Sequence, residues 1–162
     1  MKVVRGIGAA TAVLLLSGCA MASNLPTDPK ARIAEAKKIT QQAERDVVSL
    51  LPEGEVESVD QIQQGSFLSC SGGYQWSGSI RAQLRAGIDA QRAQSRLAEA
   101  ARARDYKVSD SDLLAGGKQY QVTSNTDVQL FVTVWDAGKA IQIDSASPCF
   151  SLPGDFDRPR SY

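Results

Sequence analysis

The sequence predicts an α+β domain, in which an antiparallel sheet carries two helices on one face, in the order α-β-β-α-β-β-β. Apolar residues recur at helical spacing in residues 29–51 and again in 88–104. Apolar and polar side chains alternate along residues 74–84, which is typical of a strand with one buried face. Because hairpins and helices are interspersed without strict β-α-β alternation, we expect an antiparallel sheet rather than a parallel one.

The first helix is predicted over residues 29–51. Asp28 precedes it as an N-cap, and Pro29 occupies its first position, where a missing N–H is harmless. Pro52 follows and ends the helix. The polar and acidic residues 53–64 are expected to form a connector or an irregular edge of the sheet.

The cleanest strand pattern follows this connector. Residues 65–70 and 74–84 flank Ser71-Gly72-Gly73, and glycines supply the positive φ angles that a tight hairpin needs. The second helix, over 88–104, is rich in alanine and arginine, which are both good helix formers. Its arginines are interpreted as a solvated face paired with acidic residues, and an anion site is the alternative.

The C-terminal third reads as a strand meander. Turn residues separate its apolar, alternating segments. These segments begin near residue 106, cover 118–123 and 128–135, and resume at 141. The predicted domain therefore spans residues 28–153, and the polar, proline-containing residues 154–162 are expected to be a loose tail.

The N-terminus carries the features of an export signal. Lys2 and Arg5 precede the apolar run 7–16, which is too short to span a bilayer as a helix and has the proportions of a cleavable signal. Leu16-Ser17-Gly18-Cys19 closes that run and resembles the bacterial lipobox. The resemblance implies a signal peptide over residues 1–18, a lipid anchor on Cys19, a tether over 19–27 and an extracytoplasmic location at the cell membrane. An ordinary secretory signal with a stray cysteine is the alternative.

Two cysteines remain besides the lipobox cysteine, Cys70 and Cys149. In an oxidising, extracytoplasmic setting, two such residues predict a disulfide. A redox pair or metal pair is the alternative, although the chain has no C-x-x-C motif and no histidine.

The sequence offers little for catalysis. Without histidine, Ser-His-Asp and Cys-His mechanisms are excluded, and no G-x-S-x-G motif is present. Asp110-Ser-Asp112 could begin a calcium loop, but Ala115 and Gln121 stand where that loop needs glycine and glutamate. Eighteen basic residues balance eighteen acidic ones, so no basic patch points to nucleic acid. We therefore expect a protein that is not an enzyme and binds neither metal nor cofactor.

Aromatic residues are the better functional candidates. Phe131 and Trp135 share the strand face opposite the valines, and together with Tyr120 they could form an exposed patch for a partner or a ligand. If both faces of the sheet are covered, these three residues belong to the core instead.

Several of these features together resemble a group of small actinobacterial cell-envelope lipoproteins. The resemblance rests on the lipobox, Cys70-Ser-Gly-Gly after a strand, and the closing Ser147-Pro-Cys149. Asp105-Tyr106 stands where members of that group often have Gly-Trp. The resemblance implies lipid on Cys19 and a disulfide between the other two cysteines, and it implies no activity.

Three functions follow as hypotheses. The first is a non-catalytic binding or accessory module of the envelope, with the membrane and another envelope protein as partners. The second is a carrier of a lipid or small hydrophobic molecule, which predicts an enclosed apolar cavity between sheet and helices. The third is a hydrolase that works without histidine, through carboxylates or Ser and Lys in a cleft.

Overall fold

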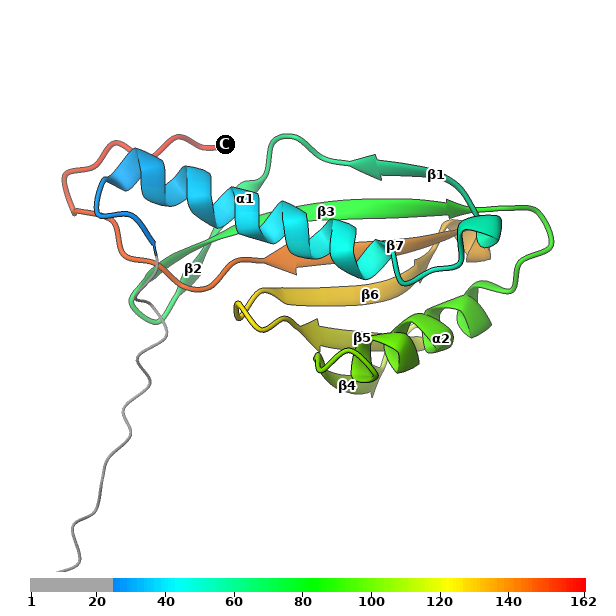
Figure 1. The fold of residues 1–162 in the computed structure, drawn as a ribbon. Helices are drawn as coiled ribbons and strands as arrows, with labels where there is room; N and C mark the ends of the chain where they lie inside the picture. The colour runs from blue at the N-terminus through cyan, green and yellow to red at the C-terminus, as the bar shows by residue number, and fades with distance from the viewer. Residues whose placement is uncertain (1–24) are drawn as a thin grey trace, which may run out of the picture.

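A computed structural model describes residues 25–162, in which one seven-stranded antiparallel sheet is combined with two α-helices (Figure 1). The strand order is β1-β3-β7-β6-β5-β4, and β2 pairs separately with β3. The elements in chain order are α1 (Pro29–Val48), the 3₁₀ turn η1 (Glu53–Glu55), β1 (Val56–Gln61), β2 (Ser66–Cys70), β3 (Gly73–Leu84), α2 (Ala90–Arg102), β4 (Lys107–Asp112), β5 (Lys118–Thr123), β6 (Gln129–Trp135), η2 (Asp136–Gly138) and β7 (Ala140–Ala146).

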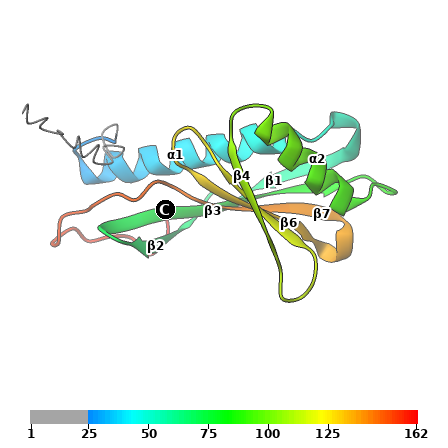
Figure 2. The ribbon, with the colours of Figure 1, turned by 90° about the horizontal axis from the view of Figure 1, so that it is seen from below.

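Both helices lie on the same side of the sheet (Figure 1 and Figure 2). The strand register places one row of apolar residues under them, in which Ile80 pairs with Ile143, Ile143 with Val132, and Val132 with Tyr120. The helices contribute many alanines to this core, and their small side chains allow each helix to approach the sheet closely. The predicted fold class, an antiparallel sheet with two helices on one face, is confirmed.

The sheet of the described residues has two more strands than the predicted order α-β-β-α-β-β-β, one on each side of α2. One of them, β1, lies in residues that the sequence predicts to be a connector or an irregular edge. Residues 56–61 form β1 at the edge of the sheet, so the order is α-β-β-β-α-β-β-β-β within the described residues. Four of the six side chains of β1, including that of Val59, are exposed, and the two at its ends are half-buried. A strand buried on neither face does not need alternating apolar residues, which explains why its sequence reads as a connector.

Helix α1 begins at the predicted residue and ends slightly earlier than predicted. The Asp28 carboxylate accepts the Ala31 N–H at 2.8 Å, which confirms the N-cap of α1. This helix ends at Val48 rather than at residue 51, because the N–H of Leu50 and that of Leu51 bond to carbonyls three residues back and tighten the last turn. Helix α2 is likewise two residues shorter at each end than predicted.

The loose tail predicted over residues 154–162 is wrong. Tyr162 and Gly65 exchange backbone hydrogen bonds of 3.2 and 2.9 Å. The buried Trp76 donates its indole N–H to the Tyr162 carbonyl at 2.9 Å, and the Arg158 guanidinium lies 4.6 Å from the centroid of an aromatic ring on β3. These contacts satisfy the indole and add to a second apolar cluster, separate from the main core.

The described part of the predicted tether, residues 25–27, also packs on the domain. Leu25 contacts the second apolar cluster. Arg32 on α1 donates to the carbonyls of Pro26 and Thr27 at 2.7 and 2.9 Å. The folded unit therefore begins at least three residues before the predicted boundary at residue 28.

Candidate functional site

The structure confirms the disulfide predicted between Cys70 and Cys149. Their Cα atoms lie 6.2 Å apart, across 79 positions of sequence. Cys70 ends β2 and Cys149 follows β7, so the bond joins the edge hairpin to the segment that leaves the centre of the sheet. The predicted signal peptide (residues 1–18) and the predicted lipid site, Cys19, lie outside the described residues.

The three aromatic residues of the predicted patch do not share one face. Phe131 and Trp135 lie on the side of the sheet opposite the helices, and Trp135 is 51% exposed. Tyr120 pairs with the buried Val132 and is only 8% exposed on the helix side, where the Arg102 guanidinium lies over its ring. The grouping with Tyr120 is therefore wrong, because an odd number of positions separates it from the other two in the strand register.

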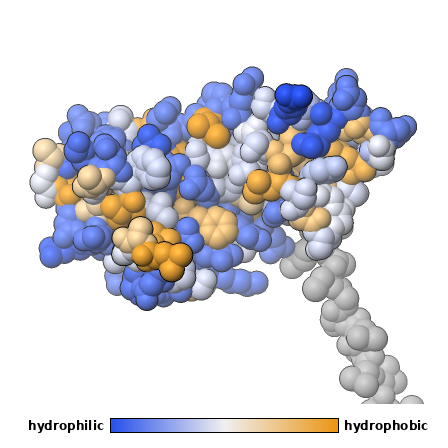
Figure 3. All heavy atoms as spheres, turned by 180° about the vertical axis from the view of Figure 1, so that it is seen from behind, coloured by the Kyte–Doolittle hydropathy of each residue, from blue (hydrophilic) through white to orange (hydrophobic). Residues whose placement is uncertain are grey.

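We call the side of the sheet opposite the helices the open face. No helix within residues 25–162 covers it, and Figure 3 shows this side of the molecule, on which blue and pale residues surround several groups of orange ones. Paired residues of antiparallel strands point to the same side, so the register defines its members in four rows. They are Lys107, Thr123, Gln129, Ala146, Ser77 and Ser66; Ser109, Gln121, Phe131, Asp144 and Ser79; Ser111, Gln119, Thr133, Gln142, Arg81 and Asp60; and Trp135, Ala140, Gln83 and Ser58.

Most side chains of the open face are amides or hydroxyls. Its four rows contain no aliphatic side chain larger than alanine, and the exposed Leu68 lies on β2 beyond the first row. The sequence carried a signal for this surface, because the polar positions of each alternating strand are mainly Gln, Ser and Thr. Alternation alone identifies these positions as the solvated side of the sheet and does not indicate a binding surface.

A chain of hydrogen bonds crosses the centre of the open face. Arg81 Nε donates to Gln142 Oε1 at 2.8 Å, and Gln142 Nε2 donates to Asp144 Oδ1 at 3.0 Å. The Arg81 guanidinium also lies over the ring of Trp135, 5.5 Å from its centroid. These contacts order three polar side chains and hold an exposed indole beside them.

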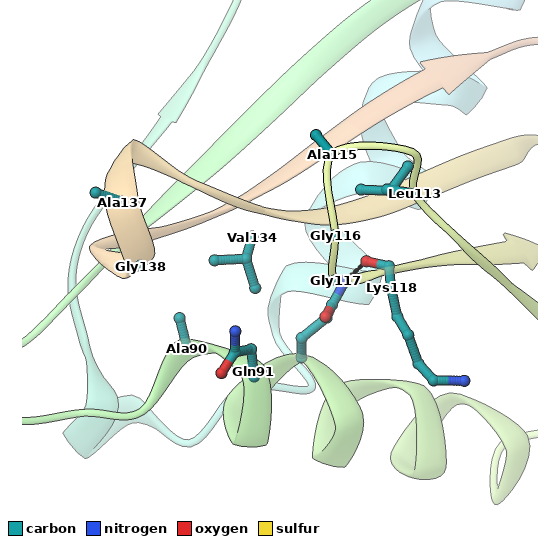
Figure 4. Close-up of a pocket in the computed structure, with 11 residues that line it drawn as sticks. Ala90, Gln91, Leu113, Ala115, Gly116, Gly117, Lys118, Val134, Ala137 and Gly138 are labelled. Atoms are coloured by element: carbon teal, nitrogen blue, oxygen red, sulfur yellow. Dashed lines mark hydrogen bonds between the residues drawn. The ribbon is translucent and has the colours of Figure 1, made fainter.

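A depression of about 490 Å³ lies at the end of the sheet, between the start of α2, the β4–β5 hairpin and η2 (Figure 4). Its lining consists of Ala90, Gln91, Gln94, Leu113, Ala115, Gly116, Gly117, Lys118, Val134, Ala137 and Gly138. The Gln94 amide donates to the carbonyls of Lys118 and Val132 at 2.9 Å each, and Lys118 Nζ binds Asp110 at 2.6 Å. The depression is partly open to solvent and its lining is as polar as it is apolar, so it differs from the enclosed apolar cavity expected of a carrier.

Glu44 is the one carboxylate among the residues buried in the described core. It lies between α1 and the sheet, where it accepts hydrogen bonds of 2.5 Å from the Ser145 hydroxyl and from the Gln61 amide. Burial raises the pKa of Glu44 above its ordinary value, although the two hydrogen bonds oppose the shift. The side chain is inaccessible to solvent, so a substrate cannot reach it without opening the core.

Two further findings concern the described residues. No group of three or more His, Cys, Asp or Glu side chains in residues 25–162 is arranged to hold a metal ion. None of the helices in that part of the chain is long and apolar enough to cross a membrane.

Comparison with known proteins gives one match. The model of a family described as the OmpA-like transmembrane domain matches residues 35–152, from the first turns of α1 to just beyond the disulfide. No curated protein and no solved structure matches the chain.

Proposed function

Because the chain belongs to the OmpA-like transmembrane domain family, we propose that it is a non-catalytic binding module of the cell envelope that acts through its open face. The family membership associates the chain with the envelope. The proposal adds three points: that the protein binds rather than catalyses, that Cys19 carries a lipid anchor, and that the open face is the binding surface.

The observation that carries the binding role is the open face itself. This uncovered sheet face presents an exposed tryptophan, Trp135, beside the ordered Arg81–Gln142–Asp144 chain. An exposed indole next to ordered polar groups offers a ligand both apolar contact and hydrogen-bonding partners. A non-catalytic role agrees with the absence of histidine from the whole sequence and with the inaccessibility of Glu44.

The lipid anchor rests on the sequence. Leu16-Ser17-Gly18-Cys19 follows a charged start and a short apolar run, which is the arrangement of a lipoprotein signal. Two or more acyl chains on one cysteine give stable attachment, since each buried CH₂ contributes about 0.8 kcal/mol. Such an anchor places the folded module at the membrane surface and leaves its sheet free to bind.

Fractionation and mass spectrometry test the anchor. The wild-type chain is expected to sediment with membranes, and its intact mass should correspond to a chain that starts at Cys19 and carries acyl groups. Cys19→Ala should move to the soluble fraction, while Ser23→Ala, a matched control in the same segment, should stay with the membrane. A Cys19→Ala chain that remains in the membrane fraction would contradict the anchor.

Ligand carriage is the second candidate function. Only the size of the depression in Figure 4, about 490 Å³, supports it. Native mass spectrometry of the detergent-extracted protein separates the two proposals. A carrier retains a lipid-sized adduct on the folded chain, and a module that binds through its open face does not.

A further inference from the structure

The composition of the open face restricts the chemistry of its ligand. The centre of a protein–protein interface is typically apolar, with aromatic, methionine and arginine side chains. The open face instead presents many amide and hydroxyl groups between only two aromatic residues, Phe131 and Trp135. A flat protein partner would bury these polar groups, and each one left without a hydrogen bond would weaken binding. A ligand that is itself dense in hydrogen-bonding groups avoids this cost.

The charge of the open face is balanced. Its rows contain two cations, Lys107 and Arg81, and two anions, Asp144 and Asp60. Arg81 stands next to Asp60 in the β1–β3 register and is linked to Asp144 through Gln142. The face therefore has no excess charge with which to attract either an anionic or a cationic ligand, and it complements an uncharged one.

The aromatic residues provide a surface for rings. Trp135 is 51% exposed and Phe131 is half-buried. Both lie on β6 and face the same side of the sheet, with Thr133 between them on that side. An exposed aromatic side chain packs well on the apolar face of a saturated ring, while hydroxyls at the edge of that ring can bond to neighbouring amides. Glutamine side chains donate and accept, so they suit hydroxyl groups of either role.

We propose that the open face binds an uncharged polysaccharide of the cell envelope, with sugar rings packed against the exposed part of Trp135 and their hydroxyls bonded to the amide and hydroxyl side chains of the neighbouring rows. This assignment rests on the proposed function and specifies its ligand. A repeating chain of hydroxyl-bearing rings matches the repeating rows of polar side chains, whereas a single small sugar would occupy only one part of them.

The test uses the full chain, solubilised in detergent. Polysaccharides from the organism's own envelope are freed of protein and separated into neutral and acidic fractions, and each is cast into a native gel. The neutral fraction is expected to retard the wild-type chain. Trp135→Ala should bind about tenfold more weakly or worse, and Trp135→Phe should recover part of the loss. Leu114→Ala, which removes a fully exposed apolar side chain outside the open face, should bind like the wild type.

The outcomes separate this assignment from the proposed function. Retardation by the acidic fraction alone, or by neither fraction, overturns the polysaccharide assignment. A photo-crosslinking residue placed at position 133 in cells then shows whether the open face binds a protein instead. A protein captured there leaves the open face as a binding surface with a protein ligand. If no crosslinked species forms and no fraction binds, both proposals fail.

Discussion

Removing the disulfide between Cys70 and Cys149 should lower the free energy of unfolding by an amount set by the length of the loop that the bond closes. The perturbation is the pair of substitutions Cys70→Ser and Cys149→Ser, made in a Cys19→Ser background so that no other cysteine remains. With a sequence separation of 79 between the two cysteines, the chain-entropy relation gives a loss of about 4.5 kcal/mol in the free energy of unfolding. For a domain of this length, that loss corresponds to a fall in Tm of about 15 °C.

Most of this loss should come from the unfolded state. Close to the disulfide, Tyr74 and Phe150 exchange two backbone hydrogen bonds of 2.8 Å each, and these bonds hold the same two segments together without the sulfur bridge. The folded variant is therefore expected to keep its native structure, while its unfolded chain gains conformational freedom.

Urea denaturation, followed by tryptophan fluorescence and circular dichroism, measures the effect. The variant should show a lower midpoint, a steeper dependence on urea because its unfolded chain exposes more surface, and an unchanged near-UV spectrum before unfolding. A loss below about 1 kcal/mol would refute the reasoning, because it would mean that the disulfide hardly constrains the unfolded chain. A native spectrum already altered without urea would also refute it, because the disulfide would then be needed for native packing.

Three further substitutions test the packing. Burial raises the pKa of Glu44 above its ordinary value of 4.5, so the folded wild type loses stability as this carboxyl ionises with rising pH. Glu44→Gln should therefore become increasingly more stable than the wild type as pH rises above 4.5. Urea midpoints across the pH range measure this difference in stability, and a difference that does not change with pH would contradict it. Gly78→Ala should cost about 1–3 kcal/mol, because its new Cβ would overlap the Trp76 ring, whereas Gly54→Ala, where nothing lies within 4 Å, should change thermal stability by less than about 0.5 kcal/mol. Asp89→Ala should cost about 1 kcal/mol by removing the N-cap bond of α2, and calorimetry that shows no loss would refute that role.

Patterns along the chain were enough to predict the fold class, both helices and the disulfide. The caps of the helices are local, and the alternation in β3 directly reports one buried face and one solvated face. Strand β1 could not be predicted in the same way, because an edge strand with its four central side chains exposed carries no alternating apolar pattern.

The candidate site depended on information that alternation alone does not contain. Phe131 and Trp135 could be placed on one face from the sequence, because they lie an even number of residues apart on one strand. Tyr120 lies on a different strand, and only the strand register shows that it faces the helices. The link from Arg81 through Gln142 to Asp144 likewise joins β3 to β7, far apart in sequence. The docked segment 154–162 was missed because its few apolar side chains pack on a cluster formed by distant residues.

The central claim is that the open face is occupied in the envelope, and oxidative footprinting in intact cells tests it most directly. Trp135 is exposed on the open face, and Leu114 is exposed on the β4–β5 hairpin away from it. The account predicts that Trp135 is oxidised several-fold more slowly in cells than in the purified protein, after correction by Leu114 in the same sample. Equal oxidation of Trp135 in cells and in the purified protein would show that the face is free, and would contradict the account.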